Sequence, residues 1–127
     1  MRSIWIPKFG SPDVLEVRET PDPTPKEGEV RIRVRASGLN FAEVMARKGM
    51  YPDAPKAPFV AGYEVAGTID AVGPGVDGSL VGKRVAALVR FGGHADVVCV
   101  PERQAFPMPD AMSFEEGAAL PVNYLTA

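Results

Sequence analysis

One short stretch of the chain carries polar side chains in a pattern that could do chemistry: residues 37–52, SGLNFAEVMARKGMYP. It contains neither cysteine nor histidine, and it offers Asn40 and Tyr51 instead. A catalytic zinc needs about three protein ligands drawn from cysteine, histidine and carboxylates. The stretch therefore predicts chemistry that works without a metal.

The spacing within this stretch predicts a short helix over residues 41–48, because apolar residues recur at helical intervals and Gly49 provides a C-terminal stop. Asn40 then falls at the N-cap of the helix. The side chain of Glu43, three residues later, can accept a hydrogen bond from the Asn40 backbone N–H, as in a capping box. A cap uses the side-chain oxygen of Asn40 and not its amide donor, so capping and a functional role can coexist.

The strand predicted over residues 30–36 alternates strictly between apolar residues and arginines. Arg31, Arg33 and Arg35 share one face of it. These arginines could form an anion site, but charges at alternate strand positions usually mark the solvated face. We therefore assign them no function.

Short apolar runs bounded by turn residues predict further strands. They cover residues 2–6, 14–18, 65–72, 81–89 and 95–100. Ser113 and Glu116 form a second capping box that opens a short helix, which Pro121 is expected to end. The predicted fold is a single, mainly β domain with short helices.

Composition limits the partners and the location of the protein. The chain has 127 residues, with 14 basic and 16 acidic side chains, so it lacks the strongly positive field that favours nucleic acid or an anionic membrane. No apolar run approaches the roughly 20 residues that span a bilayer. The single cysteine, Cys99, is expected to be an inert core thiol. We expect a soluble, cytoplasmic protein.

Two other features are poor candidates for a site. Residues 73–78, GPGVDG, have the glycine spacing of a dinucleotide-binding fingerprint, but the sequence after them predicts a strand where that fingerprint needs a helix. We expect a hairpin loop there. His94 follows two glycines without a neighbour at metal-ligand spacing, which predicts an exposed turn residue.

The order of several segments resembles the N-terminal part of medium-chain dehydrogenase/reductases. The resemblance rests on GLNFAE followed by RKGMYP, then PFVAGYEVAG, VGKRVAAL, FGGHADVVCVP and MSFEEGAALPVNYLTA. It is closest to the zinc-free quinone oxidoreductases, which include relatives of the vesicle amine transport protein. The resemblance implies a GroES-like, partly open β-barrel with short helices over residues 1–120. Residues 121–127 would lead into a Rossmann cofactor domain that this chain does not contain.

The resemblance also implies a reaction. Asn40 stands where the zinc-dependent alcohol dehydrogenases have their first catalytic cysteine, and Tyr63 stands where they have the histidine beside Glu64. A single remaining carboxylate does not hold zinc. Without a Lewis acid, hydride transfer from NADPH to an electron-poor quinone or enone is the more natural reaction.

Site residues follow from the same resemblance. Asn40 would face both the nicotinamide and the substrate carbonyl, and the hydroxyl of Tyr51 would donate a hydrogen bond in the pocket. Asn123 and Thr126 would bind the cofactor. Two alternatives stay open: Tyr51 as an aromatic lid packed beside Pro52, and Asn123 as a helix cap.

For the chain as a whole, the resemblance implies a small-molecule quinone or enone substrate, with a homodimer possible. The 127 residues alone are expected to lack turnover, because a Rossmann domain normally supplies most of the binding energy for the cofactor. Two alternatives are a GroES-like binding or assembly module without chemistry and an enoyl-thioester reductase of the same superfamily.

Overall fold

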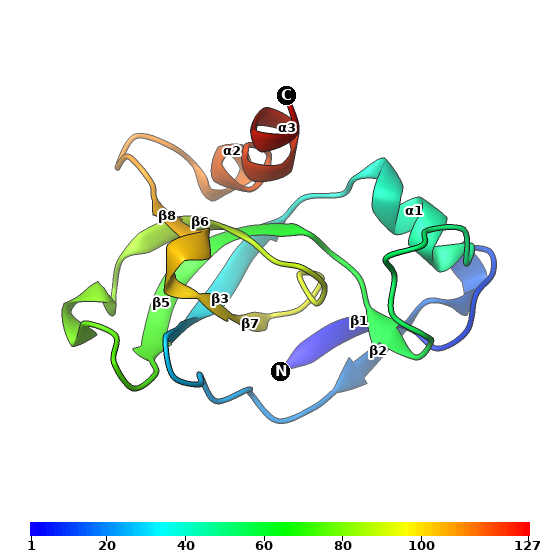
Figure 1. Ribbon diagram of the computed structural model, residues 1–127, viewed down its shortest axis with the longest axis horizontal. Coiled ribbons are helices and arrows are strands. Elements are labelled where there is room, and N and C mark those ends of the chain that lie inside the picture. Colours follow the sequence, from blue (N-terminus) through cyan, green and yellow to red (C-terminus); the bar gives the residue numbers. More distant parts are fainter.

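The computed structural model describes residues 1–127, and two antiparallel sheets form its frame (Figure 1). The three-stranded sheet has the order β2-β1-β4 and contains β1 (Arg2–Ile6), β2 (Glu16–Glu19) and β4 (Phe59–Val60). The five-stranded sheet has the order β7-β3-β5-β6-β8 and contains β3 (Glu29–Ser37), β5 (Glu64–Val72), β6 (Arg84–Leu88), β7 (Val97–Pro101) and β8 (Ala105–Pro107). A bridge between Ser3 and Ala95 joins the two sheets.

The larger sheet curls around an apolar core, which confirms the mainly β, partly open barrel. On β3 the alternation has the predicted effect, since Val30 and Ile32 point inward and are fully buried. They pack in a cluster of 9 buried residues that also includes Val65, Ile69 and Val85 from the neighbouring strands. Each such side chain stabilises the fold by about 2 kcal/mol through burial.

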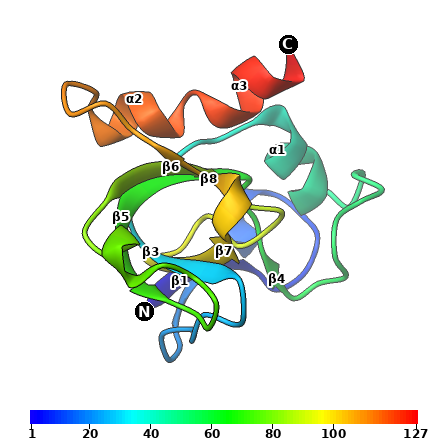
Figure 2. The same cartoon turned by 60° about the vertical axis from the view of Figure 1, so that its left-hand side comes forward.

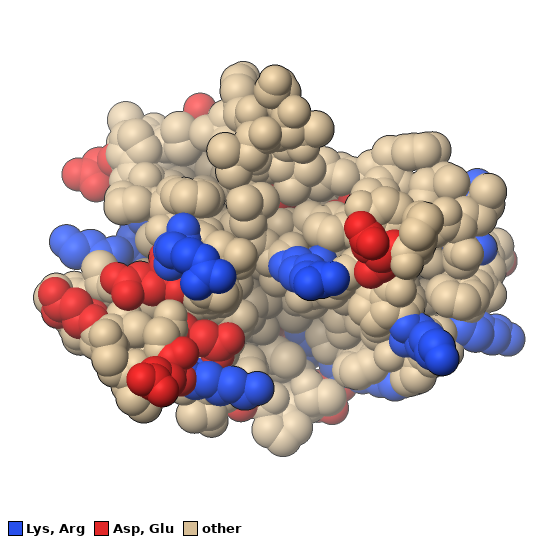
Figure 3. All heavy atoms as spheres, viewed as in Figure 1, with Lys and Arg blue, Asp and Glu red and all other residues tan.

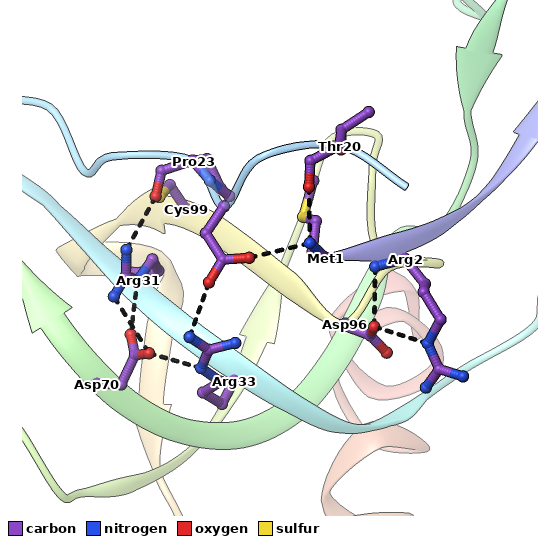
Figure 4. Close-up of polar contacts among 10 residues, drawn as sticks. Met1, Arg2, Thr20, Pro23, Arg31, Arg33, Asp70, Asp96 and Cys99 are labelled. Carbon is purple, nitrogen blue, oxygen red and sulfur yellow. Dashed lines mark hydrogen bonds and ion pairs between the residues drawn. The ribbon is translucent and has the colours of Figure 1, made fainter. Parts of the chain in front are cut away.

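The arginine face of β3 is solvated at Arg33 and Arg35, as predicted, and it also carries ion pairs that the sequence did not reveal (Figure 4). Arg31 and Arg33 each place Nε 2.8 Å from a carboxylate oxygen of Asp70 on β5. Arg33 also reaches Asp22, at 2.8 Å, and Asp22 lies 3.1 Å from the α-ammonium group of Met1. These ion pairs tie the connector before β3 to the sheet, and they leave the guanidinium groups matched by carboxylates.

Charged side chains are also intermixed over the face drawn in Figure 3, where basic and acidic groups lie side by side. The projection at the top of that view is formed by α3 and carries no charged side chain. No helix of the structure combines the length and apolarity needed to pass through a bilayer.

Three short helices complete the fold, namely α1 (Phe41–Arg47), α2 (Phe114–Ala118) and α3 (Pro121–Thr126). Single 3-10 turns occupy η1 (Pro12–Val14), η2 (Gly78–Leu80) and η3 (Glu102–Gln104). Figure 2 shows α2 and α3 in a row above the larger sheet, with α1 below the end of α3. Pro121 follows α2, which it was predicted to end, and it is also the first residue of α3. At that position the N–H that proline lacks would have no helical partner, so its absence costs nothing.

The loop over residues 73–78 joins β5 to η2 and β6, as expected for a connection between antiparallel neighbours. The glycine fingerprint is therefore not followed by a helix that could receive a pyrophosphate. Two strands were not predicted from the sequence, β4 and β8. They contain only 2 and 3 residues, too few to show a period.

Cys99 lies on β7 and is only half-buried, so it is not fully enclosed in the core as predicted. Burial raises the pKa of its thiol to about 11, and the Glu29 carboxylate acts in the same direction. The nearest polar partner of its sulfur is the Pro23 carbonyl oxygen, 3.9 Å away.

We expect Cys99 to react slowly with iodoacetamide at pH 8. Only the thiolate is nucleophilic, and a pKa of about 11 leaves about a hundredfold less thiolate than an ordinary cysteine has at this pH. Mass spectrometry of timed samples measures the rate, with unfolded protein in urea as the control. Equal rates in the folded and unfolded protein would contradict the assignment.

Gly67 lies where the backbone of β3 approaches β5 too closely for a side chain. A Cβ atom at this position would lie 2.0 Å from the Arg33 carbonyl oxygen and 2.9 Å from Cγ2 of Ile32. Gly67→Ala is therefore expected to lower the free energy of unfolding by about 1–3 kcal/mol through overpacking. Thermal unfolding measures the loss. Gly78→Ala is the matched control, because a Cβ atom at Gly78 meets nothing within 4 Å; equal melting temperatures for the two variants would refute the close approach.

Candidate active site

Asn40 occupies the N-cap of α1, as predicted, with an extended backbone at φ −120° and ψ 161°. Its backbone N–H donates to Oε2 of Glu43 at 2.6 Å, which is the return half of the capping box. The Asn40 side chain approaches the Glu43 backbone N–H without the geometry of a full cap hydrogen bond. Its amide nitrogen instead donates to Oε1 of Glu64 at 3.0 Å. The side chain therefore has a partner outside the helix that the sequence did not reveal.

Glu64 is the first residue of β5, and it is only 2% exposed. While Oε1 accepts from Asn40, Oε2 accepts from the backbone N–H of Val122 at 2.9 Å. Val122 belongs to the first turn of α3, where backbone N–H groups lack helical partners. One buried carboxylate thus contacts the start of α1 and the start of α3.

The carboxylate needs a glycine beside it. A Cβ atom at Gly38 would lie 2.1 Å from Oε1 of Glu64. The Gly38 N–H also donates to the Glu64 backbone carbonyl at 3.1 Å, so the two segments are in close contact. No other residue type fits here without displacing the carboxylate.

His94, in the loop before β7, contacts the segment that contains Gly38. This corrects the prediction that His94 is an exposed turn residue. It is half-buried, and its Nε2 lies 3.1 Å from the Gly38 carbonyl oxygen. Ser37 donates from its hydroxyl to the Gly93 carbonyl at 2.6 Å. The loop before β7 therefore braces the segment that leads into Asn40.

Tyr51 follows the C-terminal end of α1 and packs edge-on against Tyr63, with ring centroids 6.1 Å apart. Tyr63 in turn contacts Phe91 at 5.1 Å, and Phe91 contacts Phe59 at 6.2 Å. Tyr51 also packs against the small core cluster that contains Phe59 and Ala46. Its ring is therefore held by an aromatic row.

The hydroxyl of Tyr63 is buried and has no hydrogen-bond partner. Burial raises its pKa far above the usual value, and the nearby Tyr51 hydroxyl adds to this, although the two form no hydrogen bond of normal geometry. The phenol is therefore protonated at neutral pH.

Tyr63 and Glu64 together fix both ends of α1. Tyr63 contacts Tyr51 beyond the last turn of the helix, and Glu64 contacts Asn40 at its cap. α1 has 7 residues and is therefore about 10 Å long, with Asn40 at its cap and Tyr51 beyond its last turn. The two candidate groups thus follow from opposite ends of the helix, and they could contact different parts of one bound molecule.

The candidate cofactor residues lie on α3. Asn123 and Thr126 are exposed there. The Asn123 side chain donates to the Ala119 carbonyl at 3.2 Å, and the N-cap of α3 is Leu120, so Asn123 is not the cap. Cofactor binding by Asn123 and Thr126 stays a prediction.

The three residues at the positions of zinc ligands offer an amide, a phenol and one carboxylate, namely Asn40, Tyr63 and Glu64. No group of three or more histidine, cysteine, aspartate or glutamate side chains lies together anywhere in residues 1–127. The largest hollow, about 760 Å³, is lined by residues such as Ile69 and Met108 and does not include the candidate site.

Comparison with known proteins identifies this arrangement of sheets and helices. Residues 26–110 match the family model of the alcohol dehydrogenase GroES-like domain. The synaptic vesicle membrane protein VAT-1 homolog-like of Mus musculus is 42% identical over 127 residues, which cover 100% of this chain and 30% of that protein.

Two solved structures have the same fold. That of the human synaptic vesicle membrane protein VAT-1 homolog-like protein aligns with a TM-score of 0.95 and 41% identity, covering 99% of this chain and 41% of that one. The quinone oxidoreductase from Thermus thermophilus, which was also solved in complex with NADPH, gives a TM-score of 0.84 and 40% identity, covering 99% and 38%.

The chain therefore belongs to the alcohol dehydrogenase GroES-like domain family, within the medium-chain dehydrogenase/reductase superfamily. Its relatives include both VAT-1 homologues and quinone oxidoreductases. It spans 30% of the length of the mouse relative and corresponds to the GroES-like part. This confirms the resemblance inferred from the sequence.

Removing the unpaired hydroxyl of Tyr63 is expected to stabilise the protein. A buried polar group without a partner costs about 1 kcal/mol or more, so Tyr63→Phe should raise the free energy of unfolding by about that amount. Chemical denaturation measures it. Tyr124→Phe is the matched control at a residue that is 72% exposed, and it should change nothing. A loss of stability in Tyr63→Phe would show that the hydroxyl has a partner after all.

Proposed function

We propose that this chain is the substrate-side domain of a zinc-independent, NADPH-dependent oxidoreductase that reduces quinones or enones. The observation that carries the proposal is the orientation of Asn40, whose amide nitrogen is directed by the buried carboxylate of Glu64. An amide NH₂ group has two donors, and the Glu64 contact uses one of them. The other is available to a substrate carbonyl oxygen.

The proposed role of Asn40 is electrostatic. When the acceptor is reduced, negative charge develops on its carbonyl oxygen, and a preorganised donor stabilises that charge. The Tyr51 hydroxyl, whose ring is held against Tyr63, would supply a second donor at the other end of α1. Both groups act in place of the Lewis acid that zinc provides in other members of the superfamily.

The residues present fit the nicotinamide end of the cofactor, because they offer amide and hydroxyl groups, exposed at Asn123 and Thr126 and half-buried at Asn40. Asn40, Asn123 and Thr126 would hold that end, and the bound cofactor would supply the hydride. No phosphate cradle is present, since the glycine loop over residues 73–78 leads into η2 and β6. The main cofactor site would therefore lie in a Rossmann domain beyond residue 127, with residues 121–127 as the lead-in to it.

Apolar side chains beside the two donors suit a flat, apolar acceptor. Leu39 and Phe41 flank Asn40 and are 73% and 75% exposed, and Met50 precedes Tyr51 and is 62% exposed. A quinone ring would bury such surfaces while its oxygens accept the hydrogen bonds. This combination of exposed apolar side chains and hydrogen-bond donors favours an enzyme over a binding module.

The proposal is tested by steady-state oxidation of NADPH by the full-length protein, with a quinone, an enone and an enoyl-thioester as acceptors. Asn40→Ala should lower kcat on the order of 10²-fold, as loss of one donor to a developing oxyanion does. Tyr51→Phe should lower it less, because Asn40, the donor that Glu64 orients, remains. Tyr124→Phe controls for the loss of a phenol from the surface.

Two results would contradict the proposal. If the wild-type protein reduced none of the acceptors, the chain would be a binding module. If Asn40→Ala kept full kcat, Asn40 would have no catalytic role. Turnover by the 127 residues alone would also be unexpected, because they lack the phosphate-binding site.

A further inference from the structure

Glu64 is the most buried charged side chain of the molecule, and the proposed chemistry does not use it directly. Its two carboxylate oxygens have different partners. Oε1 accepts from the side chain of Asn40, 24 residues earlier in the chain, and Oε2 accepts from the backbone N–H of Val122, 58 residues later. An acid that is 2% exposed and makes two well-formed hydrogen bonds is a fixed structural point.

A carboxylate determines which way round the Asn40 amide lies. It has only acceptors, so it attracts the NH₂ group of Asn40 and repels the amide oxygen. The Glu43 backbone N–H, on the other side, favours the oxygen of the same amide. Both neighbours therefore select one of the two possible amide orientations, and the second Nδ2 proton is left for another acceptor.

The same carboxylate also holds α3. Its bond to Val122 satisfies a backbone donor in the first turn of the helix that carries Asn123 and Thr126. Gly38 allows the carboxylate to sit between the two helices, because a Cβ atom there would overlap Oε1. The start of α1 and the start of α3 are thus positioned by one side chain.

We propose that Glu64 is the positioning residue of the site: it sets the amide orientation of Asn40 and couples it to the placement of α3. This inference rests on the function proposed above. Glu64 does not contact the reacting atoms in this account, because both of its oxygens are occupied and it is shielded from solvent. It acts through Asn40.

Glu64→Gln in the full-length protein is a sharp test. The substituted side chain has one acceptor and one NH₂ group. If its oxygen keeps the bond to the Val122 N–H, its NH₂ group faces Asn40 and reverses the amide. The donor of Asn40 is then turned away from the substrate. We expect kcat to fall about tenfold, because a transition-state interaction is lost.

A double-mutant cycle separates positioning from a general structural effect. In an Asn40→Ala background, Glu64→Gln should cause no further loss of kcat, because the group through which it acts is gone. Glu116→Gln is the matched control: this carboxylate also accepts a backbone N–H at a helix cap, 3.2 Å from the Ser113 nitrogen, but it lies outside the site. It should leave kcat unchanged. Full additivity in the cycle, or an unchanged kcat in Glu64→Gln, would overturn the proposal.

A second readout does not depend on activity. The chain contains only two asparagines, Asn40 and Asn123, so ¹⁵N-asparagine labelling gives few side-chain signals from it, and Asn40→Ala assigns one of them. In wild-type protein the Asn40 Nδ2 proton that is donated to Glu64 should exchange slowly with solvent, while the amide protons of the exposed Asn123 exchange quickly. Slow exchange without any reductase activity would refute the proposed function and keep the positioning role. If the side-chain amide of Asn40 exchanged as fast as that of Asn123, the positioning role itself would be overturned.

Discussion

The buried carboxylate of Glu64 is the contact on which the arrangement of the site depends. Moving a carboxylate out of water is costly unless hydrogen bonds compensate, and here the side-chain amide of Asn40 and the backbone N–H of Val122 do so. Because burial of the carboxylate is tolerated only with these hydrogen bonds, the residues around it are also restricted. Gly38 must stay without a side chain, and the first turns of α1 and α3 must stay within reach of the same two oxygens.

The rest of the fold positions the Glu64 carboxylate. The apolar core of the larger sheet sets the position of β5, whose first residue is Glu64. The aromatic row from Tyr51 through Tyr63 to Phe91 anchors the far end of α1. A helix of 7 residues is marginal by itself, so it depends on contacts at both ends. The preceding segment is braced by the contact of His94 with Gly38.

Local signals in the sequence were enough to predict much of this frame. The alternation of β3 and the cap at Asn40 depend on residues that are near neighbours in the chain, so their patterns can be read directly. The ion pairs of Arg31 and Arg33 could not be predicted, because they depend on the register between β3 and β5 and on where the connector with Asp22 runs. The contact of Asn40 with Glu64 crosses 24 residues and needs the folded sheet.

The resemblance to a known family drew attention to Asn40 because it replaces a zinc-binding cysteine, but it gave no partner for the amide. The structure supplies that partner and gives a physical reason for the substitution. In the function proposed above, the carboxylate would orient an amide whose second N–H does part of the work that a metal does when it polarises a carbonyl.

A crystal structure of the full-length protein with NADPH bound is the most direct measurement of this account. It should show the Asn40 amide between the Glu64 carboxylate and the nicotinamide, with the nitrogen on the carboxylate and α3 still bonded through Val122. An Asn40 side chain turned into solvent, or a metal ion bound between Asn40 and Glu64, would contradict it.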